Sequence, residues 1–210
     1  MSGPAAAALA VPPAVPMALD RAWFDRPSKS VARDLLGMRL VHKAAAGPVG
    51  GQIVEVEAYQ GPEDLAAHSA RGRTARNAVM FGTRGHLYVY LVYGLHHCLN
   101  VVCGPGAKPE AVLIRALALD EGLDLARLRR GPAVPPARLA SGPGNVGQAL
   151  GIDRSLNGAD LLAGPVRLEP RSGPMPAVAR GRRIGVAYAG PWAERELRFW
   201  IADDPHVSRR

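Results

Sequence analysis

A predicted β-hairpin is the feature that most constrains how this chain can fold. Side chains alternate in character along Leu87–Val92, with the period of two that a half-buried strand requires. An extended pattern resumes from Cys98 to Val102. The segment Tyr93–His96 between them predicts a hairpin tip, so the chain should build an antiparallel sheet.

The remaining pattern mixes helices and short strands without regular βαβ alternation, which predicts an α+β fold. We expect one helix over Val31–Leu36, capped by Ser28 or Ser30 and stopped by Gly37, and a turn over Ala44–Gly51. Further helices are predicted from Asp120 to about Arg130 and over Gly147–Leu150. Further strands are predicted over Met38–His42, Ile53–Tyr59, Ala111–Leu119, Leu161–Glu169, Ile184–Ala187 and Leu197–Ile201.

Length and charge limit the functional classes. A chain of 210 residues is long enough for one sizeable core. The net charge of +8 suits a polyanionic partner such as nucleic acid. However, nearly all the cations are arginines, and a GC-rich coding bias would also produce that composition.

The two cysteines and the N-terminal residues also carry information, about disulfides and membrane spans respectively. If the extended segment that begins at Cys98 continues to Cys103, the Cα atoms of these two cysteines are roughly 16 Å apart, too far for a disulfide. We expect free thiols in a reducing cytoplasm. Residues 1–17 are apolar but interrupted by prolines, which predicts a disordered tail rather than a membrane span.

Glu55 and Glu57 are the first candidates for chemistry. Both fall on one face of the strand Ile53–Tyr59, with Cα atoms about 6.6 Å apart. They are either the exposed face of a half-buried strand or acids at a site. As a pair they fit glycosidic hydrolysis, and singly either fits a general base beside a cation. Arg115 lies in an apolar run and needs a buried carboxylate partner, for which these two are candidates.

The long loop Gln60–Arg84 is the second candidate region, because long loops in small domains are typically functional or disordered. His68 in this loop, with Tyr59 and Tyr90, offers flat surfaces on which a nucleobase could stack. No spacing typical of a metal site occurs, so no metal is expected. Tyr93 at the hairpin tip either folds back onto the sheet or is a wedge for another molecule.

An ordered series of motifs resembles the alkyladenine (3-methyladenine) DNA glycosylases. The series covers nearly everything after the tail. It comprises Glu55-Val56-Glu57-Ala58-Tyr59, His68, Arg76-Asn77, Met80-Phe81, Tyr88-Val89-Tyr90, Tyr93-Gly94, Cys98, Asn100, Val112–Ala116, Ser141–Gly144, Gln148–Leu150, Ile184–Val186, Ala189-Gly190, Trp192-Ala193, Leu197–Phe199 and Val207-Ser208.

The resemblance implies one glycosylase domain over residues 18–210. Its fold would be a curved, mostly antiparallel sheet with peripheral helices, like the C-terminal domain of formyltransferases. The enzyme would excise damaged purines from double-stranded DNA as a monomer without a lyase step, cofactor or metal, in the cytoplasm or, in a bacterium, on the nucleoid. Flipping of the target base exposes it to the enzyme.

The resemblance also assigns roles. Glu57 would activate the attacking water, with Arg115 placing water and nucleotide. Tyr59 and His68 would stack on one face of the base and Tyr90 on the other. Asn100 would exclude normal guanine, and Tyr93 would fill the gap in the helix. DNA contacts are expected from the tip and the loop, at Leu95, His96, Arg73 and Arg76.

Some features depart from the family pattern or stay open. Asn145 stands where the family often has lysine, and His96 and His97 replace more hydrophobic residues. Glu55 has no assigned role. Two other functions compete with the glycosylase: a carbohydrate-active hydrolase using Glu55 and Glu57, and a catalytically inactive binder of damaged DNA.

Overall fold

One antiparallel sheet organises the chain in the computed structural model, which describes residues 19–209. The predicted tail, residues 1–17, lies outside the described residues. The strands are β1 (Arg39–Ala44), β2 (Gly47–Tyr59), β3 (Leu87–Val92), β4 (His96–Cys103), β5 (Glu110–Glu121), β6 (Val166–Glu169), β7 (Val178–Gly181) and β8 (Arg198–Ile201). They follow the order β3-β4-β5-β2-β1-β6, with β8 pairing to β2 and β7 to β8.

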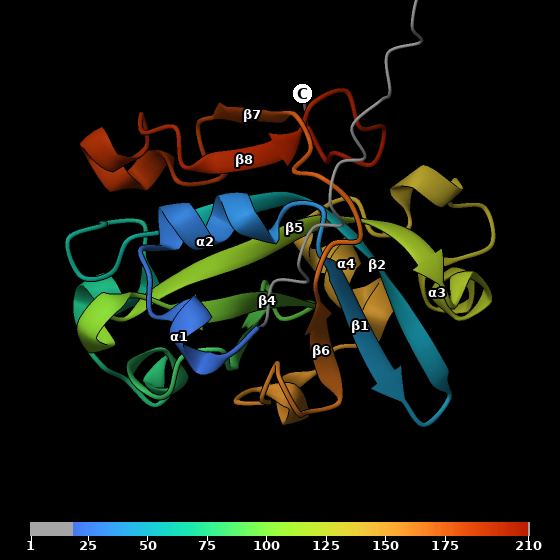
Figure 1. Ribbon diagram of the computed structural model, residues 1–210, viewed down its shortest axis with the longest axis horizontal. Helices are drawn as coiled ribbons and strands as arrows, with labels where there is room; N and C mark the ends of the chain where they lie inside the picture. Colours follow the sequence, from blue (N-terminus) through green and yellow to red (C-terminus); the bar gives the residue numbers. More distant parts are fainter. Residues whose placement is uncertain (1–18, 210) are drawn as a thin grey trace, which may run out of the picture.

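Helices lie around this sheet, so the α+β class with peripheral helices is confirmed (Figure 1). The α-helices are α1 (Arg21–Phe24), α2 (Ser28–Leu35), α3 (Leu123–Arg130) and α4 (Pro143–Leu150). The described residues also contain six short 3₁₀ segments: η1 (His68–Arg71), η2 (Ala78–Phe81), η3 (Pro105–Ala107), η4 (Pro136–Arg138), η5 (Arg154–Leu156) and η6 (Ala187–Trp192).

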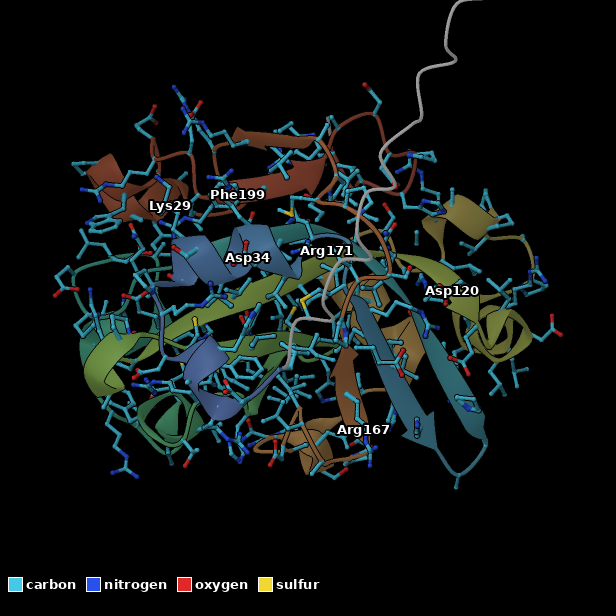
Figure 2. All side chains as sticks on the ribbon, in the orientation of Figure 1. Lys29, Asp34, Asp120, Arg167, Arg171 and Phe199 are labelled. Carbon is cyan, nitrogen blue, oxygen red and sulfur yellow. The ribbon has the colours of Figure 1, made fainter. Side chains whose placement is uncertain are left out.

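The main core forms where α2 crosses in front of β5 in Figure 1. Leu35 of α2 is fully buried, and so are Ile53 and Val56 of β2 and Ile114 of β5. Burial of each such side chain contributes about 1.5–3 kcal/mol. The charged side chains labelled in Figure 2 come from the periphery, including Lys29 and Asp34 on α2 and Arg167 on β6.

Strand β2 changes neighbours along its length. Its first half, Gly47–Gln52, pairs with β1, whereas Glu55–Glu57 pairs with β8. Strand β5 pairs with β2 on the other edge throughout. Glu55 and Glu57 therefore lie between two strands, and neither side chain has exposed surface. The alternative that these acids form an exposed strand face is wrong.

Three irregularities interrupt the pairing of β2 and β5, one between Gly50 and Gly51 and one on each side of Glu55. Ile53 pairs with Leu117 and Glu55 with Ala116, which leaves Val54 unpaired; the next pair is Val56 with Ile114, which leaves Arg115 unpaired. The carbonyl of Arg115 instead accepts a hydrogen bond from the amide of Gly142. Bulges re-aim side chains and are frequent beside active sites.

The hairpin prediction is confirmed. Leu95 N–H donates to the carbonyl of Val92, and the two residues between them, Tyr93 and Gly94, have φ of 52° and 69°. Two consecutive positive φ values are typical of a type I′ turn, whose twist matches that of a hairpin. Cys98 and Cys103 on β4 are buried free thiols, also as expected.

One predicted cap and three predicted elements are wrong. Helix α2 begins at Ser28, after Pro27 at the N-cap position, so neither Ser28 nor Ser30 caps it. Gly50 and Gly51 belong to β2 rather than a turn, because a Cβ at Gly51 would lie 2.1 Å from the Ala118 carbonyl oxygen of β5. Asp120 continues β5 instead of capping α3, which begins after Gly122. Residues 184–187 form no strand, and the strand before β8 is instead β7.

Candidate active site

A cavity of about 650 Å³ opens between the hairpin and the loop that follows β2. Strand residues and loop residues share its wall. Seven of the predicted site residues line it: Tyr59, His68, Arg76, Tyr90, Tyr93, Asn100 and Arg115. Their neighbours in the wall include Tyr88, Met80, Pro143, Ile184, Val186, Tyr188 and Arg209.

Glu57 lies directly behind this wall. Its Oε1 accepts hydrogen bonds from the Ile184 amide at 2.8 Å and lies 3.2 Å from Arg115 Nη1. Its Oε2 accepts from the Tyr59 hydroxyl at 2.9 Å. A carboxylate has about four acceptor positions, so one position on Oε2 is left without a partner among residues 19–209.

Burial and three neighbouring donors have opposite effects on the pKa of Glu57. Burial disfavours the charged carboxylate and raises its pKa above the ordinary value. The positive charge of Arg115, the amide of Ile184 and the hydroxyl of Tyr59 lower the pKa and offset part of that rise. Such a perturbed acid beside a cavity is typical of catalytic sites.

Glu55 has a different environment. Its Oε1 accepts hydrogen bonds from Arg115 Nε and Arg198 Nη1, each at 3.0 Å, and its Oε2 accepts from the Ser208 amide at 2.7 Å. Arg115 thus spans both acids, as predicted for its partners. Two carboxylates and two guanidinium groups form a network whose charges cancel, as buried ions require.

Tyr59 is fixed by a contact to the face of its ring as well as by the hydrogen bond of its hydroxyl. The Arg183 guanidinium lies over its ring, with Cζ 4.7 Å from the ring centroid. Arg183 forms a two-point ion pair with Asp64, at 2.5 and 2.8 Å, and neither side chain has exposed surface. Burial raises the pKa of Tyr59 well above its ordinary value, so the hydroxyl remains protonated.

His68, Tyr88 and Tyr90 form a second aromatic group. The His68 and Tyr90 rings are 4.5 Å apart at 70°, in edge contact, so no third ring fits between them. His68 Nδ1 is 2.9 Å from the Tyr88 hydroxyl. Burial, and secondarily the nearby Arg76 charge, lowers the pKa of His68, which is therefore neutral at pH 7.

Asn77 shapes the loop that carries His68. Its amide donates to the carbonyls of His68 and Gly72, each at 2.9 Å, and its Oδ1 accepts from the Thr74 amide. Arg76, the next predicted contact residue, lies over the Tyr90 ring at 5.3 Å and donates to the Leu91 carbonyl. Arg73, by contrast, is exposed and is absent from the cavity wall.

The hairpin tip is the most exposed part of the site. Tyr93 is 90 % exposed and Leu95 is 78 % exposed, so Tyr93 does not fold back onto the sheet. His96 is also exposed and lies against Gly144 of α4. Leu95 and His96 do not line the cavity, although they flank Tyr93, which does.

Asn100 lies deep in the cavity wall. It is buried, and its side-chain amide donates to the Tyr88 carbonyl at 3.1 Å. This bond fixes the amide beside the aromatic group. Asn145, at the position where the family often has lysine, donates to the Ser141 carbonyl just before α4.

Several important residues were missed by reasoning from the sequence. These residues are Asp64, Arg183 and Ile184, and only Ile184 was predicted to lie in a particular element, a strand. Their partners are more than a hundred residues away, so no local pattern reveals the pairing.

The part of the chain that the structure describes holds neither a cluster of metal ligands nor a membrane-spanning helix. No group of three or more His, Cys, Asp or Glu side chains converges among residues 19–209. None of the helices in that range has the length and hydropathy of a membrane span.

Comparisons with known proteins agree on one family. Residues 22–205 match the family model described as methylpurine-DNA glycosylase (MPG). A protein of Streptomyces avermitilis is 48 % identical over 198 residues, which cover 90 % of each chain. One of Corynebacterium glutamicum strain ATCC 13032 is 48 % identical over 187 residues, covering 89 % of this chain and 95 % of the relative. One of Methanocella arvoryzae is 47 % identical over 193 residues, covering 91 % and 96 %. All three are provisionally named 3-methyladenine DNA glycosylases.

Proposed function

This chain belongs to the methylpurine-DNA glycosylase family, and from that premise we propose how its pocket excises a base. The substrate is a damaged purine, such as 3-methyladenine, in double-stranded DNA. The enzyme binds as a monomer, flips the nucleotide into the cavity and leaves an abasic site. A base inside the stack is otherwise out of reach of any side chain in the pocket.

The observation that carries this proposal is the position of Glu57. Its carboxylate is buried behind the cavity wall, with three donors and, as far as residues 19–209 are concerned, one free acceptor position on Oε2. A water at that position gives its proton to Glu57 while its oxygen bonds to the sugar C1′. The bond from C1′ to the purine nitrogen breaks, and its electron pair leaves with the base.

The environment of Glu57 suits this step. An alkylated purine is positively charged and departs as a neutral base, so the main need is a general base, typically worth about 10²–10⁴ in rate. Arg115 contacts Glu57 and lines the cavity, where it can orient both water and nucleotide. Because Glu57 has no exposed surface, we expect a small movement of Tyr59 or Arg115 to admit the water.

The aromatic residues suit a flat base. Tyr59 and Tyr90 both line the cavity and offer stacking faces. His68 is in edge contact with Tyr90, so we expect it to border the base or to shift when the base enters. Tyr93, at the exposed tip, enters the gap left by the flipped nucleotide, with Leu95, His96, Arg73 and Arg76 near the DNA backbone.

The proposal includes hydrolysis alone, without strand cleavage. A lyase step through a Schiff base needs an amine nucleophile. The three lysines of the chain, Lys29, Lys43 and Lys108, are all absent from the cavity wall. We therefore expect uncut abasic DNA as the product.

The test is release of free base from duplexes that contain one alkylated purine. The unaltered protein should release the base and leave the strand intact until alkali is added. Glu57→Gln should lower the single-turnover rate by at least about a hundredfold while still binding the duplex. An unchanged rate in Glu57→Gln would exclude Glu57 as the base, and absence of release by the unaltered protein would favour an inactive binder.

A further inference from the structure

The buried ion pair between Asp64 and Arg183 lies directly behind one stacking face of the cavity. Arg183 has no exposed side-chain surface and is absent from the cavity wall, while its guanidinium lies over one face of the ring of Tyr59, which lines the cavity. A base stacked on the other face would lie about 8 Å from this cation.

Arg183 links two backbone segments around the cavity. Its Nη1 donates to the Ala58 carbonyl at 3.0 Å and its Nη2 to the Trp192 carbonyl at 3.2 Å. It thereby joins the end of β2 to η6 and supports the Tyr59 ring by a cation–π contact. A planar guanidinium can make all these contacts at once, which a lysine cannot.

The same cation has an electrostatic cost for a charged substrate. A purine methylated on a ring nitrogen carries positive charge, and a desolvated cation on the far side of its stacking partner repels it. The negative charge of Asp64 cancels the repulsion that the Arg183 cation would exert. Its two oxygens pair with Arg183, and they also accept from the amides of Gln60 and Ala66, so the carboxylate is held in place from both sides.

Arg76 provides a contrast within the same cavity. Its guanidinium lies over the other platform, Tyr90, but this side chain is exposed, and no carboxylate lies within ion-pair distance among residues 19–209. Solvent screens an exposed charge. Of the two cations that lie over the tyrosine platforms, only the buried Arg183, which solvent cannot screen, is matched by a carboxylate.

We infer that Asp64 is a specificity-determining residue, whose carboxylate cancels the charge of Arg183 behind Tyr59 and so allows the pocket to accept positively charged purines. The inference rests on the proposed role of Tyr59 as a stacking platform. Asp64 acts through Arg183 and Tyr59 and does not touch the base.

The test compares two lesions in otherwise identical duplexes: 7-methylguanine, which is cationic, and hypoxanthine, which is neutral. The readout is the ratio of their single-turnover excision rates. Asp64→Asn leaves the buried cation unmatched and should lower this ratio roughly tenfold. Arg183→Gln leaves an unmatched carboxylate and should raise it, and the double variant, with no charge at either position, should return close to the native ratio.

Opposite shifts cannot come from simple structural damage, which would slow both excisions alike. If Asp64→Asn does not fold, Arg183→Gln must still exceed the double variant in this ratio. Equal ratios in all variants that fold would overturn the inference. Tyr59→Leu separates this result from failure of the proposed function: if it slows both excisions while the ratios stay equal, the platform stands and only the role of Asp64 is lost. Native rates in Tyr59→Leu would overturn both.

Discussion

The hydroxyl of Tyr59 donates a 2.9 Å hydrogen bond to the carboxylate of Glu57, two residues earlier on the same strand. Residues two apart on a strand share a face. The proposed stacking platform, Tyr59, and the proposed general base, Glu57, are therefore joined both by the backbone and by this hydrogen bond. If a nucleotide moves the Tyr59 ring on entering, that movement also acts on the carboxylate proposed to activate water.

This bond leads to a prediction about pH. Glu57 must be ionised to act as a base, and its pKa is raised by burial but lowered by the Tyr59 hydroxyl. The excision rate should therefore fall with decreasing pH at a midpoint above 4.5, the ordinary value for glutamate. Tyr59→Phe removes a donor that favours the charged form, so the midpoint should move to still higher pH.

Single-turnover rates across the acid range measure this midpoint. Tyr188→Phe is the matched control, since the Tyr188 hydroxyl contacts the Ala66 carbonyl rather than Glu57. It should leave the midpoint in place. A midpoint that is the same in Tyr59→Phe and in the unaltered enzyme would contradict the coupling.

Glu55→Gln should destabilise the fold. Glu55 is the shared partner of Arg115 and Arg198, and all three side chains are buried. Removing its charge leaves two buried cations with one remaining carboxylate, a change that typically costs about 3–5 kcal/mol. The free energy of unfolding from a urea titration checks this value.

Glu63→Gln is the control for that titration. Glu63 also pairs with a cation, Lys108, but on the surface. Surface ion pairs contribute little, so its unfolding curve should overlay that of the unaltered protein. Equal stability of Glu55→Gln and Glu63→Gln would show that Glu55 does not hold the network together.

The hairpin could be predicted from the sequence because its information is local. Alternating side chains and Tyr93-Gly94 are sufficient to specify two strands and the turn between them. The partners of Arg115 could also be anticipated, since a cation in an apolar run needs buried acids and few were within reach.

The failures come from information that is distant in the chain. Residues 184–187 have the composition of a strand, but the Ile184 amide donates to Glu57 rather than to a neighbouring strand. Asp120 looks like a helix cap, yet it pairs with Arg39 of β1 at the end of a longer strand. The Asp64–Arg183 pair joins positions 119 residues apart, and only the folded chain brings them together.

Tyr93 should show opposite effects on stability and activity. Its φ of 52° is costly for any residue except glycine and, to a lesser degree, asparagine. Tyr93→Asn should therefore raise the free energy of unfolding by up to about 1 kcal/mol. Excision should fall roughly tenfold, because the wedge that offsets unstacking is lost.

Urea titration and single-turnover excision measure the two effects. A mispaired lesion costs less to flip, so excision by Tyr93→Asn should recover in part on such a duplex. Leu128→Ala is the control, since Leu128 is also an exposed apolar residue but lies on α3. Its excision rate should be unchanged, and a native rate in Tyr93→Asn would contradict the wedge.

Asn100→Ser should relax discrimination against normal guanine. The Asn100 amide is buried in the cavity wall and held by the Tyr88 carbonyl, so it occupies fixed space where a guanine amino group would lie. Serine is shorter and frees that space, and removing a steric or polar mismatch of this kind is typically worth about 10-fold or more in selectivity.

The measurement is guanine release from undamaged duplex DNA relative to release of an alkylated purine. Asn77→Ser, also a buried asparagine, holds the loop rather than the base, so it should slow both releases alike. Guanine release by Asn100→Ser no greater than by Asn77→Ser would remove Asn100 from the discrimination.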